Sequence, residues 1–266
     1  MTVCYNKLMK TYIVGNWKMH FTIGEASIYL HKLLKKITPA KGLQVAVAPS
    51  LIALQPLSLQ LQKNERKKIK LVAQNCCAKD YGAYTGETGI AQLRGLVDFC
   101  IVGHSERRYV FGETEKVIKE KVAACVRNNI TPILCVGETE NERTFGETAD
   151  ALKNQIVSGL SDVSREDLKK VIIAYEPVWA ISSVKGARIA VPDDVASSIK
   201  TIRKHLKATF GKEAEEIPVL YGGSVNPSNC GAYLTIPGVN GLLVGGSSLI
   251  ADQFNDIIDI AKRVKE

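Results

Sequence analysis

Residues 171–180 read Val-Ile-Ile-Ala-Tyr-Glu-Pro-Val-Trp-Ala, and this stretch decides the fold that we predict. Its first five residues are apolar, β-branched or aromatic, a composition typical of a buried strand. Pro177 ends the strand, because proline lacks the backbone N–H that a central ladder needs. Glu176 is therefore expected at the strand's C-terminal tip, where parallel α/β folds build ligand sites. On its own, a solvated carboxylate at a strand end is the simpler interpretation.

Outward from this stretch, apolar runs and helical patterns alternate along the chain. We expect strands at residues 12–17, 43–48, 69–74, 99–102, 131–136, 171–175, 218–220 and 241–244. We expect helices at residues 24–37, 54–62, 113–128, 147–160, from Pro192 onward and at 252–262. Continuous apolar strands that alternate with helices indicate parallel strands joined by right-handed crossovers. Eight such units favour an α/β fold of the (β/α)8 barrel type, a single domain over residues 1–266, rather than an open doubly wound sheet.

The composition excludes several classes of protein. The chain has 266 residues and no apolar run as long as a membrane span, and its first ten residues lack the apolar region of a secretory signal. We therefore expect no membrane partner and a cytoplasmic location. The seven cysteines form no Cys-x-x-Cys pair, and none of the four histidines has metal-ligand spacing, so we expect neither a disulfide framework nor a metal centre.

The formal net charge is +8, and much of the excess lies in residues 32–36 and 63–70. No aromatic stacking motif or known nucleic-acid module accompanies these basic runs. A solvated loop and helix face is the simpler interpretation, and we expect no nucleic-acid partner. A positive surface also attracts a small anionic substrate.

Polar residues stand at the C-terminal ends of several predicted strands, which share one mouth in a barrel. They are Asn16 and Lys18 after the first strand, His104 to Arg108 after the fourth, and Glu176 after the sixth. Taken singly, Lys18 reads as a surface lysine and His104 as a capping or core histidine. Their convergence from separate strands favours a catalytic site.

Two glycine pairs, Gly222-Gly223-Ser224 and Gly245-Gly246-Ser247, follow the seventh and eighth predicted strands. Glycine lets backbone N–H groups approach an anion without an intervening Cβ, and the loops after these strands are the usual phosphate site of barrel enzymes. A simple turn explains either pair alone equally well. Together they favour a phosphate monoester as ligand.

Eight motifs in the chain resemble those of the triosephosphate isomerase family, in the family's order and over nearly the whole chain. They are Gly15-Asn16-Trp17-Lys18-Met19, Ala73-Gln74-Asn75, Gly82-Ala83-Tyr84-Thr85-Gly86-Glu87, Val102-Gly103-His104-Ser105-Glu106-Arg107-Arg108, Cys135-Val136-Gly137-Glu138-Thr139, Ala174-Tyr175-Glu176-Pro177-Val178-Trp179-Ala180-Ile181, Tyr221-Gly222-Gly223-Ser224-Val225 and Leu243-Val244-Gly245-Gly246.

The resemblance implies the interconversion of dihydroxyacetone phosphate and glyceraldehyde 3-phosphate through an enediolate. Glu176 would be the base and His104, as a neutral imidazole, the electrophile. Lys18 would offset negative charge, with Asn16 as a further donor, while Glu106 would orient Lys18 or relay protons. The substrate-binding residues would be Asn16, Lys18, Ser182, Ser224, Gly245 and Gly246. No cofactor or metal is expected, because side chains supply every acid and base.

The resemblance also implies a homodimer. Residues 75–87 are similar to the loop that projects into the neighbouring subunit in this family, which would bring Thr85 near Asn16 of the partner subunit. A long exposed loop without a partner is the alternative. Cys76 and Cys77 lie at the root of this loop, so thiol modification is expected to disturb the dimer.

The chain departs from the family pattern in the lid that follows the catalytic glutamate. The lid tip of the family reads Ala-Ile-Gly-Thr-Gly-Lys, whereas here residues 180–185 read Ala-Ile-Ser-Ser-Val-Lys and the segment is a few residues longer. Val184 does not readily take a positive φ, although Ser182 still has a backbone N–H for the phosphate.

Because lid closure protects the enediolate, we expect an active isomerase with a weaker phosphate grip or altered lid kinetics, and more methylglyoxal by-product. The alternative is a catalytically impaired barrel that binds a phosphate ligand or has another role. The presence of all four principal catalytic residues argues against it. A sugar-phosphate lyase fits less well, because no lysine is placed centrally on a strand to form a Schiff base.

Overall fold

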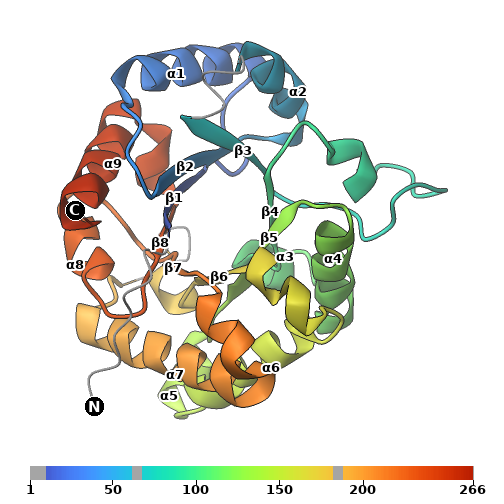
Figure 1. Ribbon diagram of the computed structural model, residues 1–266, viewed down its shortest axis with the longest axis vertical. Helices are drawn as coiled ribbons and strands as arrows, with labels where there is room; N and C mark the ends of the chain where they lie inside the picture. The colour runs from blue at the N-terminus through green and yellow to red at the C-terminus, as the bar shows by residue number, and fades with distance from the viewer. Residues whose placement is uncertain (1–9, 62–67, 182–187, 266) are drawn as a thin grey trace.

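The computed structural model describes residues 10–61, 68–181 and 188–265. Within these residues, eight parallel strands close into a barrel in sequence order, with β1 paired to both β2 and β8 (Figure 1). The strands are β1 (Thr11–Asn16), β2 (Leu43–Ala48), β3 (Ile69–Ala73), β4 (Phe99–Val102), β5 (Thr131–Val136), β6 (Ile172–Tyr175), β7 (Val219–Tyr221) and β8 (Gly241–Val244). The predicted (β/α)8 barrel is confirmed.

Helices surround the barrel on all sides in Figure 1. The α-helices are α1 (Ile23–Lys36), α2 (Leu51–Gln60), α3 (Ser105–Tyr109), α4 (Glu115–Arg127), α5 (Glu140–Thr144), α6 (Thr148–Leu160), α7 (Pro192–Phe210), α8 (Cys230–Leu234) and α9 (Ala251–Lys265). Short 3-10 turns are η1 (Ile90–Leu93), η2 (Arg165–Lys170), η3 (Val178–Ala180), η4 (Gly211–Glu216) and η5 (Gly246–Leu249). No helix in these described stretches is long and apolar enough to cross a bilayer.

The core has two layers, and β6 shows why the strands read as continuous apolar runs. Ile172 and Ala174 pack inside the barrel, whereas Ile173 and Tyr175 pack between the barrel and the helices. Successive side chains of a strand point to opposite faces, so a strand covered on both faces must be apolar throughout. The barrel is therefore filled with side chains, and ligands meet it at its ends.

The helices follow from the amphipathic patterns in the sequence. Helix α1 begins at a capping box in which Thr22 and Glu25 satisfy each other's backbone N–H groups. Its buried residues lie on one face, spaced by three or four positions, as expected for a helix against a core. They are Ala26, Tyr29, Leu30, Leu33 and Leu34.

The structure differs from the prediction at several element ends. Helix α2 begins at Leu51, not at residue 54, and it includes Pro56. The one-turn helices α5 and α8 and the 3-10 turns were not predicted, because so few residues give no periodic signal. Helix α3 begins at Ser105, directly after His104.

Residues 74–89, between β3 and η1, extend away from the barrel on the right of Figure 1. The root of this segment is pinned by the bridge between Cys77 and Gly89, and Cys77 N donates to Thr88 O at 2.8 Å. Arg127 and Asn128, at the end of α4, both donate to the carboxylate of Asp80. The segment therefore has a fixed base on the barrel.

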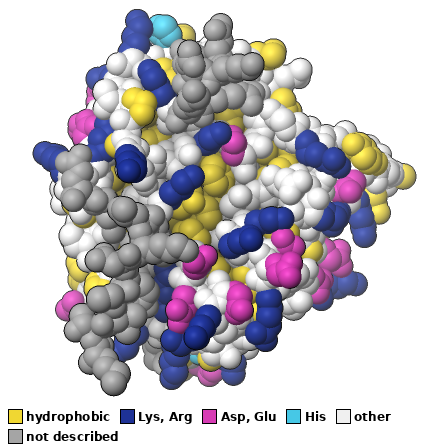
Figure 2. All heavy atoms as spheres, viewed as in Figure 1, with side chains coloured by type: hydrophobic (Ala, Val, Ile, Leu, Met, Phe, Trp, Pro, Cys, Tyr) yellow, Lys and Arg dark blue, Asp and Glu magenta, His cyan; other side chains and the backbone are white. Residues whose placement is uncertain are grey.

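The surface charge is mixed. On the face shown in Figure 2, Lys and Arg side chains are interspersed with Asp and Glu side chains. Salt bridges such as Lys36–Asp252 and Lys70–Asp98 pair part of the positive excess. Residues 63–67 of the second basic run lie outside the described residues, so the interpretation of the basic runs as solvated surface stays a prediction.

Candidate active site

Side chains from β1, β4 and β6 meet at the C-terminal mouth of the barrel. His104 Nε2 lies 3.3 Å from Glu176 Oε1, and Lys18 Nζ lies 2.7 Å from Glu106 Oε1. His104 Nδ1 lies 3.7 Å from Glu106 Oε2. The structure thus brings together four of the predicted catalytic residues in one continuous chain of contacts.

Glu176 follows β6 and is almost completely buried, with 3% of its surface exposed. Its backbone N donates to Val136 O at 2.8 Å, which fixes the start of the side chain. A Cβ on Gly222 would lie 2.9 Å from Glu176 Cγ, so glycine is needed there to leave room for the carboxylate. Glu176 Oε2 accepts no hydrogen bond from the described residues. Burial, and then the charge of Glu176, raise the pKa of the neighbouring Cys135 thiol.

His104 caps the N-terminus of α3, and this role fixes its tautomer. The backbone N–H of Glu106 donates to His104 Nδ1 at 3.2 Å. A nitrogen that accepts a hydrogen bond carries the lone pair, so in the neutral ring the proton resides on Nε2. The imidazole therefore presents an N–H donor toward Glu176 and the barrel mouth.

Lys18 adopts a left-handed backbone conformation, with φ at 50°. This conformation costs a residue with a Cβ about 1–2 kcal/mol, and two hydrogen bonds hold it. Lys18 N donates to Asn16 Oδ1 at 3.0 Å, and Gln74 Nε2 donates to Lys18 O at 2.7 Å. Asn16 is buried at the end of β1 and so positions Lys18 as well as lining the mouth.

The glycine pairs stand at the ends of β7 and β8. A Cβ on Gly245 or on Gly246 would meet no heavy atom of the described chain within 4 Å, so both backbones border open space. Ser224 donates to Ala180 O through its backbone N at 3.0 Å and through its hydroxyl at 2.8 Å. Ser182 lies outside the described residues.

Comparison with known proteins identifies the family. The family model of triosephosphate isomerase matches residues 11–261. A triosephosphate isomerase of Clostridium acetobutylicum is 41% identical over 249 residues, which are 93% of this chain and 98% of the relative. Those of Carboxydothermus hydrogenoformans and Streptococcus suis are 40% and 38% identical, over 94% and 92% of this chain and 98% and 96% of the relatives.

This chain belongs to the triosephosphate isomerase family. The family match runs from the first residue of β1 into α9, so it covers the complete barrel. The resemblance carried by the motifs is thereby confirmed.

One buried carboxylate of the triosephosphate isomerase motifs, Glu138, has a role that the sequence alone did not predict. Glu138 follows β5 with none of its surface exposed, and it accepts hydrogen bonds from Trp179 Nε1 at 2.8 Å and from Tyr175 Oη at 3.1 Å. Burial raises its pKa, although these hydrogen bonds and Arg143 oppose the rise. Glu138 thus holds Trp179, three residues after Glu176. Its place at a strand end was the signal in the sequence.

Two arginines of the motif that follows β4 are structural. Arg108 Nε donates to Gly103 O at 2.7 Å, and its Nη2 donates to Cys135 O at 3.0 Å. Arg107 pairs with Glu113 at 2.6 Å. These contacts fasten the loop that carries His104 to β5 and to the start of α4.

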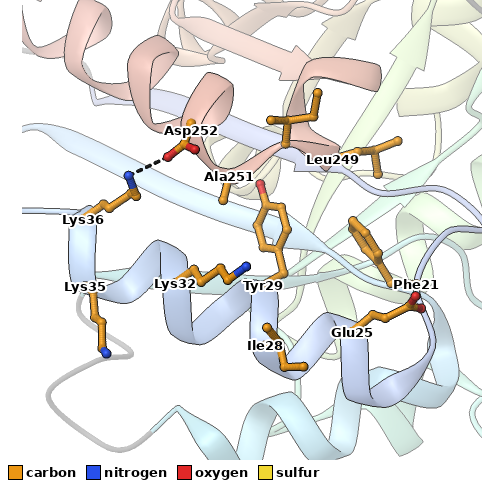
Figure 3. Close-up of a pocket in the computed structure, with 11 residues that line it drawn as sticks. Phe21, Glu25, Ile28, Tyr29, Lys32, Lys35, Lys36, Leu249, Ala251 and Asp252 are labelled. Atoms are coloured by element: carbon orange, nitrogen blue, oxygen red, sulfur yellow. Dashed lines mark ion pairs between the residues drawn. The ribbon is translucent and has the colours of Figure 1, made fainter.

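A separate pocket lies on the outside of the barrel, away from the catalytic residues. A cavity of about 640 Å³ lies between α1 and α9, as Figure 3 shows. Its lining combines an apolar floor, including Phe21 and Tyr29, with Lys32 and the Lys36–Asp252 ion pair. None of the predicted catalytic residues lines it.

Proposed function

We propose that Glu176 and His104 carry the reaction of this triosephosphate isomerase, the interconversion of dihydroxyacetone phosphate and glyceraldehyde 3-phosphate. The observation that supports this assignment is the 3.3 Å approach of His104 Nε2 to Glu176 Oε1 at the barrel mouth. A carboxylate base and an N–H donor face the same point there, as proton abstraction next to a carbonyl requires.

In the forward direction, Glu176 removes a proton from the hydroxymethyl carbon of dihydroxyacetone phosphate. The electrons move to the carbonyl oxygen, which His104 stabilises through its Nε2–H and which becomes the enediolate oxygen. Glu176 then returns the proton to the neighbouring carbon, which was the carbonyl carbon. One proton moves from the hydroxyl oxygen of the former hydroxymethyl group to the former carbonyl oxygen, which gives the aldehyde. Glu176 Oε2, which accepts no hydrogen bond from the described residues, is the atom that we assign to the proton transfer.

Lys18 and Asn16 supply positive charge and a further donor for the developing oxyanion. The contact of Lys18 Nζ with Glu106 supports a positioning role for Glu106, and the 3.7 Å distance from Glu106 Oε2 to His104 Nδ1 leaves the proton-relay alternative open. Neither role requires a cofactor or a metal.

For the phosphate group, we assign the backbone of Gly245 and Gly246, together with Ser182 and Ser224. The hydroxyl of Ser224 would have to leave Ala180 O to donate to the phosphate. No described protein atom would contact a Cβ on either glycine, so packing within the described chain does not explain why both residues are glycine. A bound anion that approaches their backbone N–H groups would explain it, and this supports the assignment. Weaker phosphate binding and more by-product, which we expect from the altered lid tip, remain predictions, since residues 182–187 lie outside the described chain.

The homodimer through residues 75–87, with Thr85 near Asn16 of the partner subunit, also remains a prediction. The projection of this segment from the barrel supports it (Figure 1). The cytoplasmic location remains a prediction in the same way.

Conversion of glyceraldehyde 3-phosphate by the purified protein, coupled to glycerol-phosphate dehydrogenase, tests the assignment. Glu176→Gln keeps the shape of the side chain and removes the base, and the loss of a positioned general base lowers kcat by about a hundred- to ten-thousandfold. Glu215→Gln, an exposed glutamate of η4, is the matched control and is expected to keep full activity. A folded wild-type protein that binds the substrate without turnover would instead support the impaired-barrel alternative.

A further inference from the structure

Three cysteines that are distant in the sequence meet in the wall between the barrel and the helices. Cys76 follows β3, Cys100 lies on β4 and Cys125 lies on α4, and their sulfur atoms all lie within 4.8 Å of one another. Cys76 Sγ and Cys125 Sγ are 3.8 Å apart. Only 2% of Cys76 and none of the other two is exposed, and all three are free thiols.

This spacing is close enough for the three sulfurs to share one central atom after small shifts of the side chains. Sulfur ligands sit about 2.3 Å from an ion such as zinc, which places three of them about 4 Å from one another. A structural zinc ion takes four protein ligands. The group found among the described residues offers three, so a centre that is satisfied by three sulfurs fits better.

Charge separates the remaining candidates. Monovalent copper with three thiolates carries a net charge of minus two. Lys121, whose charge acts on Cys76, is already paired with Glu113, so the charge of the copper centre would stay uncompensated, which is costly in a buried site. Trivalent arsenic with three thiolates is neutral and takes a three-coordinate pyramidal geometry. Because Cys100 and Cys125 are completely buried among core residues, a neutral adduct is the one that this site accommodates.

We propose that Cys76, Cys100 and Cys125 form a binding site for trivalent arsenic, delivered as arsenous acid. Three S–H bonds and three As–O bonds break, three As–S bonds form, and three water molecules leave. Arsenic stays trivalent throughout, so the step needs no oxidant or reductant. The adduct would tie the end of β3, β4 and α4 to one atom.

Entry to the site requires a local opening, because Cys76 is only 2% exposed and the bridge between Cys77 and Gly89 holds the base of segment 74–89. Local openings break a few contacts at a lower free energy than global unfolding. The exposed residues 81–87 follow Cys76 in the chain, whereas Cys100 and Cys125 have no exposed surface. Cys76 is therefore expected to react first, followed by Cys125 and Cys100.

Retention of arsenic after gel filtration tests the site. The full chain is kept reduced, its free thiols are counted, and bound arsenic is measured by elemental mass spectrometry after incubation with arsenite. The wild type is expected to retain one arsenic per chain and to gain thermal stability, because a ligand that the folded state binds more tightly than the unfolded chain raises Tm.

Cys76→Ser, Cys100→Ser and Cys125→Ser each leave two thiols, and affinity is expected to fall at least about tenfold, which corresponds to about 1.4 kcal/mol. Cys77→Ser, next in the chain, and Cys230→Ser, a buried thiol outside the cluster, are the matched controls and are expected to bind as the wild type does. Circular dichroism without arsenite verifies that every variant is folded.

X-ray absorption at the arsenic K-edge gives a second readout that does not depend on a variant. Three sulfur neighbours and no oxygen are expected in the wild type. The proposal is overturned if the wild type retains no arsenic, if the cluster variants bind as tightly as the two controls, or if the absorption spectrum shows fewer than three sulfurs. None of these readouts depends on catalytic turnover, so the proposal stands or falls separately from the assignment of Glu176.

Discussion

Gly222 and Glu176 come from different strands, and the glycine leaves the space that the carboxylate occupies. A Cβ at position 222 would be 2.9 Å from Glu176 Cγ and 3.3 Å from Glu176 Oε1. The carboxylate would have to move by several tenths of an ångström to accept it. The position of the base thus depends on a residue without a side chain.

We therefore expect Gly222→Ala to lower kcat by up to about a hundredfold, because misplacement of a reacting group by about 1 Å has an effect of that size. Steady-state kinetics with glyceraldehyde 3-phosphate measures it. Gly231→Ala, in α8, is the control, since the nearest atom to its added Cβ is 3.6 Å away. Equal kcat values for the two variants would contradict the idea that Gly222 positions Glu176.

At the scale of elements, Glu138 connects β5 to η3. It accepts hydrogen bonds from Tyr175 of β6 and from Trp179 of η3, and Arg143 of α5 lies 3.7 Å from it. Burial holds its pKa above the ordinary value. The turn after Glu176 is thus attached to a carboxylate whose protonation depends on pH.

The raised pKa predicts the sign of a pH effect on stability. In an unfolded chain a glutamate has a pKa of about 4.3. Between this pH and the raised pKa of Glu138, the folded state binds more protons than the unfolded state. The free energy of unfolding therefore falls as the pH rises through this window. Glu138→Gln removes this contribution, so the variant is expected to gain stability relative to the wild type as the pH rises, measured by urea unfolding.

Glu25→Gln is the control of opposite sign. Hydrogen bonds from the backbone and side chain of Thr22 lower the pKa of Glu25, so its contribution to stability is present at neutral pH and is lost as the pH falls through the lowered value. If the free energies of unfolding of both variants, relative to the wild type, changed in the same direction with pH, the effect would not be specific to the buried carboxylate.

The elements also show what the sequence could and could not predict. The strands were predictable because two buried faces require unbroken apolar runs, and the long helices because one buried face imposes a period of 3.6. Asn16, Lys18, His104 and Glu176 were found together because each lies at the C-terminal end of a strand or just after it. The role of Glu138 required the positions of Trp179 and Tyr175, and the thiol cluster joins residues 76, 100 and 125, which no local pattern relates.

At the scale of the whole molecule, segment 74–89 carries apolar surface away from the barrel. Tyr81 and Tyr84 are 72% and 47% exposed. Exposed aromatic side chains on a projecting segment are typical anchors of protein interfaces. The predicted homodimer would cover both rings, whereas a loop without a partner would leave them in water.

We expect Tyr81→Ser combined with Tyr84→Ser to weaken dimerisation by at least about tenfold, or about 1.4 kcal/mol, as measured by sedimentation velocity over a dilution series. Phe145→Ser removes an equally exposed aromatic ring, 75% exposed, at the end of α5 and serves as the control. A wild type that sediments as a monomer at all concentrations would refute the dimer.

The prediction that residues 1–266 form a single domain also stays a prediction.

The packing around Trp179 makes this residue an optical reporter. The Cζ atoms of Arg143 and Arg188 both lie over its indole ring, 4.3 and 5.0 Å from the ring centre. Trp17, the other tryptophan of the chain, is completely buried beside Tyr29. With Trp17→Phe, all indole emission would come from the turn that follows Glu176. A change in its intensity or wavelength on addition of a phosphate ligand would then follow the movement of that turn in real time, without any attached dye.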